Sequence, residues 1–330
     1  MPSRNLITDV AGVRVGNADD AALASGATAV VFDTPAVAAI DVRGGGPGTR
    51  ESSLLDPAMT VERIDAIALA GGSAFGLDAA SGVQAWLSEQ GRGFPVRSAR
   101  VPIVPGAILF DLLNGGDKNW GRYPPYRELG YTAAEAAAAT FALGSVGAGL
   151  GAATATLKGG LGSASATARG QYTVGALVAV NAVGSAVVGD GPWFWAAPFE
   201  RDAEFGGRGF PASLPPEALR FRAKGAPGEN TTLAVIATDA LLTKPQTRRL
   251  AIMAQDGLAR ALRPVHTPLD GDAVFAASTG AKPLDDAFVG LAELGAAAAD
   301  VLARAVARGI YEATALPFPG ALPSWRDRFG

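Results

Sequence analysis

The most constraining stretch of this 330-residue chain is residues 225–237, GAPGENTTLAVIA, where a loop rich in glycine and proline runs into an apolar, β-branched strand. The Asn230–Thr231 bond lies at the junction. If the chain cuts itself at this bond, Thr231 becomes a new N-terminus that carries both a hydroxyl nucleophile and an amine base. Other residues of the chain must then supply the groups that orient and assist Thr231.

Composition excludes most other kinds of reactive centre. The chain has no cysteine, which excludes disulfides, thiolate metal sites, iron–sulfur clusters and cysteine nucleophiles. Its single histidine is His266. A histidine-rich metal site therefore cannot be built, and a Ser-His-Asp triad would have to use His266.

The charge and the hydropathy of the chain limit which partners and which cellular compartment we expect. Hydrophobic residues make up 48% of the chain and charged residues 18%, so a sizeable core is possible, and the net charge of -3 argues against binding to nucleic acid or acidic membranes. The N-terminus lacks the apolar core of a signal peptide. The longest weakly polar run, residues 173–188, is too short to span a bilayer. We therefore expect a cytoplasmic protein with no nucleic-acid or membrane partner.

Alternating strand and helix patterns predict a single α/β domain, residues 1–330, with layered sheets and helices. The expected strands are residues 10–16, 27–32, 37–42, 64–70, a segment within 101–113, two segments of 171–188 around Gly184, 231–239 and a segment from 273. The expected helices are residues 77–90, 131–142, 285–313 and one that runs from a capping box at Thr243 to about 262. Residues 190–230 show little periodicity and are expected to be an irregular connection.

Glycine-rich segments offer weaker motifs. The cluster at 44–48 indicates either a flexible loop or a place where something approaches the backbone. In Gly71-Gly72-Ser73 a strand leads into a helix, which suits an anion or oxyanion; Ser73 is a helix cap or, alternatively, a nucleophile. Residues 147–152 match a dinucleotide fingerprint, but they follow a helix pattern and lack the acidic residue expected further along.

Five polar residues carry the chemistry that suits an N-terminal nucleophile: Thr231, Asp270, Asp272, Lys158 and Asn181. A one-residue gap on an extended chain sends the two carboxylates to one face, where they could orient the new ammonium and the hydroxyl. Lys158 could lower the pKa of the amine or polarise a substrate carbonyl, and Asn181 could donate to an oxyanion. Alternatively, Asp270-Gly271-Asp272 is only a turn and Thr231-Thr232 only the start of a strand.

At these residues the chain resembles a family of self-processing hydrolases. The family includes the L-aminopeptidase/D-alanine esterases, the β-peptidyl aminopeptidases and the nylon-oligomer (aminohexanoate-oligomer) hydrolases. The segments that carry the resemblance are 41–45, 69–77, the glycine-rich run through Lys158, Asn230-Thr231-Thr232, and 270–272. Threonine after asparagine at the cut is similar to the nylon-hydrolase branch, whereas the aminopeptidase branch has serine after glycine.

The resemblance implies a four-layer α/β/β/α sandwich of the N-terminal-nucleophile type. It further implies self-cleavage between Asn230 and Thr231 into chains 1–230 and 231–330, which stay together and form homo-oligomers such as tetramers. Thr231 would be the nucleophile, Asp270 and Asp272 its orienting carboxylates, and Lys158 and Asn181 flanking polar groups. A tyrosine assists in some members, and Tyr123 is the candidate here.

Three functions remain open on the sequence. The first is a self-activated hydrolase of small or linear amides that works through an acyl-Thr231 ester without a metal or cofactor, either on nylon-type oligomers or as an aminopeptidase. The second is a non-catalytic module that binds an anion at the glycine-rich loops. The third is a hydrolase built on Ser73 or another hydroxyl together with His266.

Overall fold

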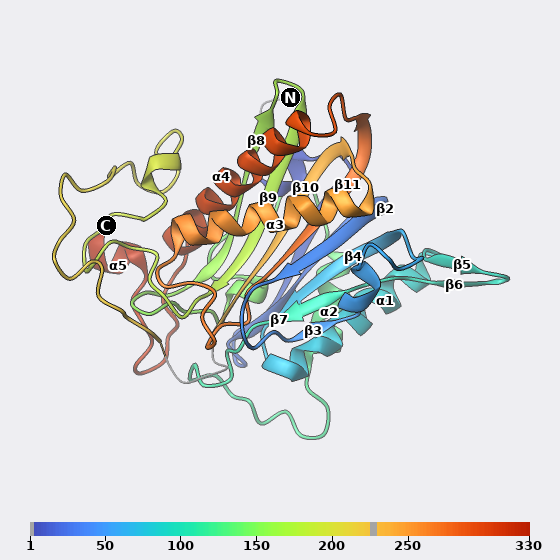
Figure 1. Cartoon of the computed structure of the whole chain (residues 1–330). Coiled ribbons are helices and arrows are strands. Elements are labelled where there is room, and N and C mark those ends of the chain that lie inside the picture. The colour runs from blue at the N-terminus through green and yellow to red at the C-terminus, as the bar shows by residue number, and fades with distance from the viewer. Residues whose placement is uncertain (1–2, 225–229) are drawn as a thin grey trace.

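The computed structural model describes residues 3–224 and 230–330, and four helices in two pairs cover its central sheet (Figure 1). One pair is α3 (Lys244–Ala261) and α4 (Val289–Tyr311), and the other is α1 (Ala79–Glu89) and α2 (Tyr126–Glu135). A short α5 (Trp325–Phe329) lies near the C-terminus.

The strands form a nine-stranded sheet in the order β3-β7-β4-β2-β11-β10-β9-β8, with β1 also paired to β2. Their bounds are β1 Val13–Asp20, β2 Ser25–Val42, β3 Thr49–Arg50, β4 Arg63–Ala70, β7 Gly106–Ile108, β8 Gly160–Ala168, β9 Tyr172–Asn181, β10 Thr231–Leu241 and β11 Ala273–Pro283. A separate hairpin, β5 (Phe94–Val96) and β6 (Ala99–Val101), projects from the body of the molecule (Figure 1).

The long strand β2 divides this sheet into two layers. Its first part pairs with β1 and β4, and its last part, from Val37 to Val42, pairs with β11. One apolar core lies between the two layers and combines side chains of β1, β2 and β4 with side chains of β9, β10 and β11. Two further cores join the outer faces to α3 and α4 and to α1 and α2. The predicted four-layer α/β/β/α sandwich is therefore confirmed.

Strand β10 is buried on both faces because it lies at the centre of its layer. Alternate residues beginning at Leu233 face the core between the sheets, whereas Ala234 and Ile236 face the helices. The strand pairs antiparallel with β9 and parallel with β11. Its first residue, Thr231, is thus placed by a rigid, hydrogen-bonded strand.

Several predicted elements are confirmed with different bounds. Helix α3 begins at the predicted capping box, in which the Thr243 N–H donates to Gln246 Oε1 over 2.9 Å and the Gln246 N–H donates to Thr243 Oγ1. The strands expected at 27–32 and 37–42 are one strand, β2, and the long helix expected at 285–313 is α4, which begins at Val289. The described part of the irregular segment, residues 190–224, contains only one short 3₁₀ helix, Ala197–Phe199.

Three predictions are wrong in detail. The alanine-rich helix expected at 131–142 is α2, which ends at Glu135 because the chain then pairs with β1, where the Val15 N–H donates to Ala138 O. The second strand expected after Gly184 is missing because Gly184 packs against the backbone of Pro264. Within 101–113 only the end of β6 and β7 are strand. In the first two cases a long-range contact overrides the local propensity.

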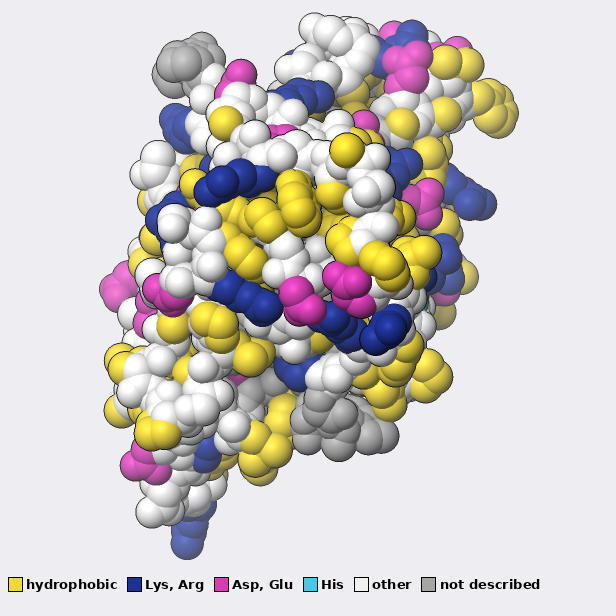
Figure 2. All heavy atoms as spheres, turned by 90° about the vertical axis from the view of Figure 1, so that its left-hand side faces the viewer, with side chains coloured by type: hydrophobic (Ala, Val, Ile, Leu, Met, Phe, Trp, Pro, Cys, Tyr) yellow, Lys and Arg dark blue, Asp and Glu magenta, His cyan; other side chains and the backbone are white. Residues whose placement is uncertain are grey.

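The molecular surface carries charges of both signs. Figure 2 shows one face on which basic and acidic side chains are interspersed around a hydrophobic area. In the part of the chain that the structure describes, no helix is long and apolar enough to cross a membrane.

Candidate active site

The Asn230–Thr231 bond is buried at the first residue of β10. The Thr231 hydroxyl donates to the carbonyl oxygen of Asn230 over 2.5 Å, and the backbone N–H of Gly271 donates to the same oxygen over 2.9 Å. The side chain most able to attack this carbonyl is therefore already in contact with it. A second donor stands where negative charge on the oxygen would develop.

Asp272 is buried beside this bond and accepts three hydrogen bonds. Its Oδ1 accepts from the N–H of Thr232 over 2.8 Å. Its Oδ2 accepts from the N–H of His266 over 3.0 Å and lies 2.9 Å from His266 Nδ1. The Asp272 carboxylate is thus fixed against the backbone of Thr232, the residue next to Thr231.

Asp270 is buried on the same loop and holds a different segment. Its Oδ1 accepts from the N–H of Val183 over 3.1 Å, and its Oδ2 accepts from the N–H and the hydroxyl of Thr267 over 3.2 and 3.0 Å. Burial, with the nearby Asp272 as a second cause, raises the pKa of Asp270. In the described part of the chain, neither carboxylate accepts from the Thr231 hydroxyl, which is occupied by Asn230.

His266 belongs to this site, which the sequence analysis did not predict. Its backbone has φ 56°, a left-handed conformation that is uncommon outside glycine. This turn directs both its N–H and its Nδ1 at Asp272. The only sequence signal was its position four residues before Asp270, and a loop position alone does not say what a ring contacts.

The glycine cluster at 44–46 packs against the carboxylate loop. The N–H of Gly44 donates to Asp272 O over 3.2 Å, and that of Gly46 donates to Asp270 O over 2.8 Å. A Cβ on Gly44 would lie 2.2 Å from Asp272 N, so a side chain cannot be accommodated there. The expectation that something approaches the backbone at this cluster is confirmed, and the approaching segment is 268–272.

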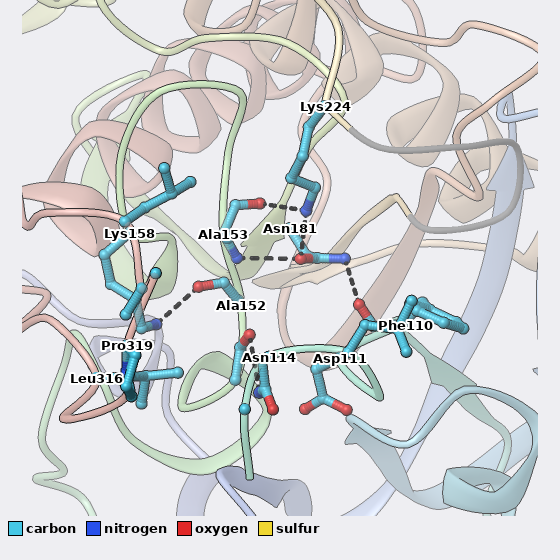
Figure 3. Close-up of a pocket in the computed structure, with 16 residues that line it drawn as sticks. Phe110, Asp111, Asn114, Ala152, Ala153, Lys158, Asn181, Lys224, Leu316 and Pro319 are labelled. Atoms are coloured by element: carbon cyan, nitrogen blue, oxygen red, sulfur yellow. Dashed lines mark hydrogen bonds between the residues drawn. The ribbon is translucent and has the colours of Figure 1, made fainter.

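A cavity of about 350 Å³ opens beside β9 (Figure 3). The lining residues are Phe110, Asp111, Leu113–Gly115, Gly151–Ala153, Lys158, Asn181, Lys224, Leu316 and Pro319–Leu322. Asn181 is the register partner of Thr231 in the antiparallel β9–β10 pair. Because paired residues present their side chains on the same face, the Thr231 side chain lies next to that of Asn181, which lines the cavity.

Lys158 and Asn181 both line this cavity. The ammonium of Lys158 donates to the carbonyl oxygens of Gly149, Ala152 and Gly159 over 3.0, 2.7 and 2.8 Å. Burial lowers the pKa of Lys158 to about 7, with Asp111 opposing and Lys224 adding to the shift. Asn181 Nδ2 donates to Phe110 O over 3.0 Å.

Asp111 is a buried cavity residue that the sequence analysis missed. It accepts from the Ser25 hydroxyl over 2.6 Å and from the Gly72 N–H over 2.7 Å, and burial raises its pKa. The anion at the Gly71-Gly72-Ser73 turn is therefore a carboxylate of the chain itself. Because this contact depends on distant parts of the chain, no local motif could have revealed it.

Two other candidates lie apart from this arrangement. Tyr123 is 78% exposed and does not line the cavity; the buried tyrosine of that segment is Tyr126, whose hydroxyl donates to Ser25 over 3.0 Å. His266 is bonded through Nδ1 to Asp272, and no hydrogen bond joins it to Ser73 in the described residues. The geometry thus gives no support to a Ser73–His266 pair.

Comparison with known proteins identifies the family. The model of peptidase family S58 matches residues 5–321. An uncharacterized aminopeptidase of Mycobacterium tuberculosis is 47% identical over 347 residues, with 98% of each chain covered. A 6-aminohexanoate-oligomer endohydrolase of Paenarthrobacter ureafaciens is 28% identical over 281 residues, which cover 82% of this chain and 74% of that protein.

Solved structures agree on the fold. The L-aminopeptidase D-Ala-esterase/amidase of Ochrobactrum anthropi, described as a variant of the Ntn-hydrolase fold, has a TM-score of 0.71 at 21% identity and covers 98% of this chain and 92% of its own. A Burkholderia sp. β-aminopeptidase has a TM-score of 0.70 at 23% identity and covers 99% and 94%. The expected resemblance to nylon-oligomer hydrolases and aminopeptidases is confirmed, and the mycobacterial aminopeptidase is more similar to the chain than the oligomer hydrolase is.

With its sandwich fold and its buried threonine site, the chain belongs to peptidase family S58 and is a hydrolase of peptide or amide bonds.

Proposed function

We propose that the chain activates itself by cleaving the Asn230–Thr231 bond and then hydrolyses amides with Thr231 as an N-terminal nucleophile. The single observation that supports this best is the Asn230 carbonyl oxygen, which accepts from Thr231 Oγ1 over 2.5 Å and from the Gly271 N–H over 2.9 Å. A hydroxyl this close to the carbonyl oxygen is also within about 4 Å of the adjoining carbonyl carbon, so only a small rotation of the Thr231 side chain is needed for attack.

The cleavage proceeds in two steps. Thr231 Oγ1 attacks the Asn230 carbonyl carbon while the Gly271 N–H stabilises the oxyanion, and the hydroxyl proton passes to the leaving Thr231 nitrogen. The C–N bond breaks and leaves an ester between Asn230 and Thr231. The Thr231 amine is free from this point, and water then hydrolyses the ester, which releases the Asn230 carboxylate and the Thr231 hydroxyl.

The same atoms then serve substrate turnover. A free α-amine titrates near ~8, so the Thr231 amine can take the proton from its own hydroxyl at neutral pH. The hydroxyl attacks the substrate carbonyl, the amine portion leaves with that proton, and water hydrolyses the acyl ester. Asp272, which sits behind Thr232, orients the new N-terminus.

Two substrate classes fit this chemistry. The mycobacterial relative and the two solved enzymes are named aminopeptidases, which favours release of an N-terminal amino acid from small peptides or amides. The relative named 6-aminohexanoate-oligomer endohydrolase favours linear oligomeric amides. Hydrolysis of amino-acid anilides compared with cyclic and linear aminohexanoate oligomers separates the two.

Intact mass spectrometry tests the self-cleavage. Purified wild-type chain should give fragments 1–230 and 231–330, and Thr231→Ala should stay at full length without activity. Thr231→Ser should still cleave because it keeps the hydroxyl, and Asp272→Asn should slow both cleavage and turnover by about tenfold or more. A full-length wild-type chain that hydrolyses amides would refute the mechanism.

A further inference from the structure

Lys224 places a cation inside the cavity that is lined in part by Asn181, the strand partner of Thr231. Its ammonium donates to Ala153 O over 2.7 Å and to Asn181 Oδ1 over 2.8 Å (Figure 3). The residue lies six positions before Asn230, in the part of the chain that would end at the cut. Its side chain therefore reaches from the pre-cleavage segment into the cavity where a substrate would have to bind.

The acceptors around this ammonium form a built subsite. Asn181 is buried on β9, and its side chain is fixed by Nδ2 donating to Phe110 O over 3.0 Å and by Oδ1 accepting from the Ala153 N–H over 3.0 Å. These contacts fix the two oxygens, Ala153 O and Asn181 Oδ1, that accept from Lys224. The carboxyl group of Asp111 lines the same cavity. Fixed oxygens close to a carboxyl group are suited to a primary ammonium.

The subsite stands at a defined distance from the reacting atom. Asn181 and Thr231 are directly paired across β9 and β10, so their Cβ atoms are about 5 Å apart. A cation on Asn181 Oδ1 would therefore be only a few bonds from a carbonyl attacked by Thr231 Oγ1. This spacing matches an amine on the α- or β-carbon of an acyl group.

Cleavage would remove a covalent restraint on the position of Lys224. In the intact chain, Lys224 is joined through Asn230 to β10, and its carbonyl accepts from Asn230 Nδ2 over 3.1 Å. Breaking the Asn230–Thr231 bond turns Asn230 into a chain end. Lys224 then has no covalent link to β10, so a substrate cation can compete for its acceptors.

We propose that Ala153 O and Asn181 Oδ1 form the subsite for the free ammonium of an aminoacyl substrate, and that Lys224 occupies this subsite as an internal substitute until the chain is cut. This inference rests on the proposed function for its substrate. It predicts a requirement for an unblocked amine close to the scissile carbonyl. It also makes the uncut chain unable to bind such a substrate.

Binding to an uncut, inactive chain tests the proposal without any turnover. All variants carry Thr231→Ala, and calorimetry measures binding of L-alaninamide and of N-acetyl-L-alaninamide. Alaninamide should bind the Lys224→Ala chain at least about tenfold more tightly than the chain that keeps Lys224, and the acetylated probe should show no such gain. Lys282→Ala, which removes an exposed lysine, controls for the loss of one positive charge.

The outcomes distinguish a specific subsite for an ammonium group from a cavity that merely gains space when the Lys224 side chain is removed. Equal affinity of alaninamide with and without Lys224, no binding to either, or an equal gain for the acetylated probe would each overturn the proposal. If melting curves show that Lys224→Ala does not fold, Lys224→Met provides the same comparison with a neutral side chain of similar size that has no hydrogen-bond donor. Because Thr231 is absent throughout, a failure of self-cleavage or hydrolysis in the wild-type chain leaves this result unchanged, and the two failures remain distinguishable.

Discussion

At the scale of the residue, the absence of a side chain at Gly271 is what allows the Thr231 hydroxyl to lie against the Asn230 carbonyl. A Cβ at position 271 would be 2.6 Å from Thr231 Oγ1 and 2.7 Å from Gly46 O. Both distances are shorter than real Cβ contacts, and one of the atoms is the proposed nucleophile. The same glycine also supplies the N–H that polarises the carbonyl.

We expect Gly271→Ala to slow self-cleavage by about a hundredfold or more, because the added Cβ would displace the Thr231 hydroxyl and the N–H of residue 271 from the Asn230 carbonyl, and misplacing one oxyanion donor typically costs that much. Mass spectrometry over time measures the rate. Gly46→Ala is the matched control because its Cβ would meet nothing nearer than Asp270 O at 3.7 Å. Equal cleavage rates for the two variants would contradict the assigned geometry.

The lowered pKa of Lys158 predicts that the stability of the folded chain depends on pH. Its folded-state pKa of about 7 lies below the ordinary lysine value of 10.5, so the unfolded chain binds an extra proton between these values. The free energy of unfolding should therefore rise with pH across this window. Lys158→Met, in the uncut Thr231→Ala chain, should lose that rise when urea unfolding is measured at pH 7, 8 and 9. An unchanged slope would show that Lys158 does not titrate in this range.

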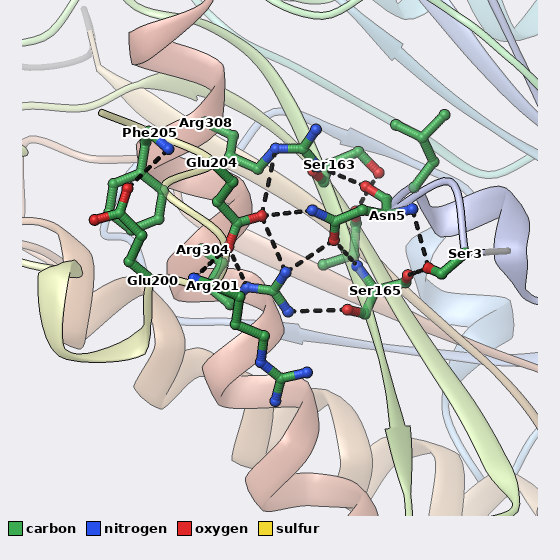
Figure 4. A network of polar contacts seen from close by, with 12 residues as sticks. Ser3, Asn5, Ser163, Ser165, Glu200, Arg201, Glu204, Phe205, Arg304 and Arg308 are labelled. Carbon is green, nitrogen blue, oxygen red and sulfur yellow. Dashed lines mark hydrogen bonds and ion pairs between the residues drawn. The ribbon is translucent and has the colours of Figure 1, made fainter. Parts of the chain in front are cut away.

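At the scale of the element, a buried ionic cluster ties α4 to the irregular segment and to the N-terminal residues (Figure 4). Glu204 accepts from Arg304 Nε over 2.5 Å and from Arg304 Nη2 over 3.0 Å, and Asn5 donates to it over 2.5 Å. The side chains of Glu204 and Arg304 are 7% and 3% exposed. Although burial alone would raise the pKa of Glu204, these hydrogen bonds and the charges of Arg304 and Arg308 lower it.

Glu204→Ala should destabilise the uncut chain by about 3–5 kcal/mol because it leaves a buried guanidinium without its partner. Urea unfolding measures the loss. The control is Glu312→Ala, which breaks the exposed 2.6 Å ion pair with Arg326 and should cost less than about 1 kcal/mol. Similar losses for the two variants would mean that the cluster contributes no more than a surface pair.

The ends of the helices and strands show which features local sequence patterns can predict and which they cannot. The capping box of α3 was predictable because a cap is made by residues three positions apart. The end of α2 was not, since alanine favours a helix through 142 and only pairing of Ala138 with Val15 on β1 ends it. The break after β9 likewise depends on Gly184 packing against Pro264.

At the scale of the whole molecule, the proposed cut crosses the middle of the sandwich. Strand β10 would begin the second chain while lying between β9 of the first chain and β11 of the second. Apolar side chains of both chains share the core between the sheets and the core under α3 and α4. The apolar surface that the two chains bury against each other is large enough to hold them together after the peptide bond is cut.

We therefore expect the cleaved protein to remain one particle. Native mass spectrometry should show fragments 1–230 and 231–330 together, and a denaturing gel should show them apart. The control is Thr231→Ala, which should give a single band under both conditions. Separation of the fragments in native buffer would contradict the shared core.

The sequence by itself determined the class of fold, the buried strand after the Asn230–Thr231 junction, and the small set of side chains available for chemistry. These follow from periodicity, from glycine and from the absence of cysteine, all of which act locally or by composition. Only the tertiary structure decided that His266 holds Asp272, that Asp111 closes the Gly72 turn, and that Lys224 lies on Asn181. Each of these contacts joins elements that are distant in sequence or depends on a turn with no sequence rule, so packing of the layers was needed to create it.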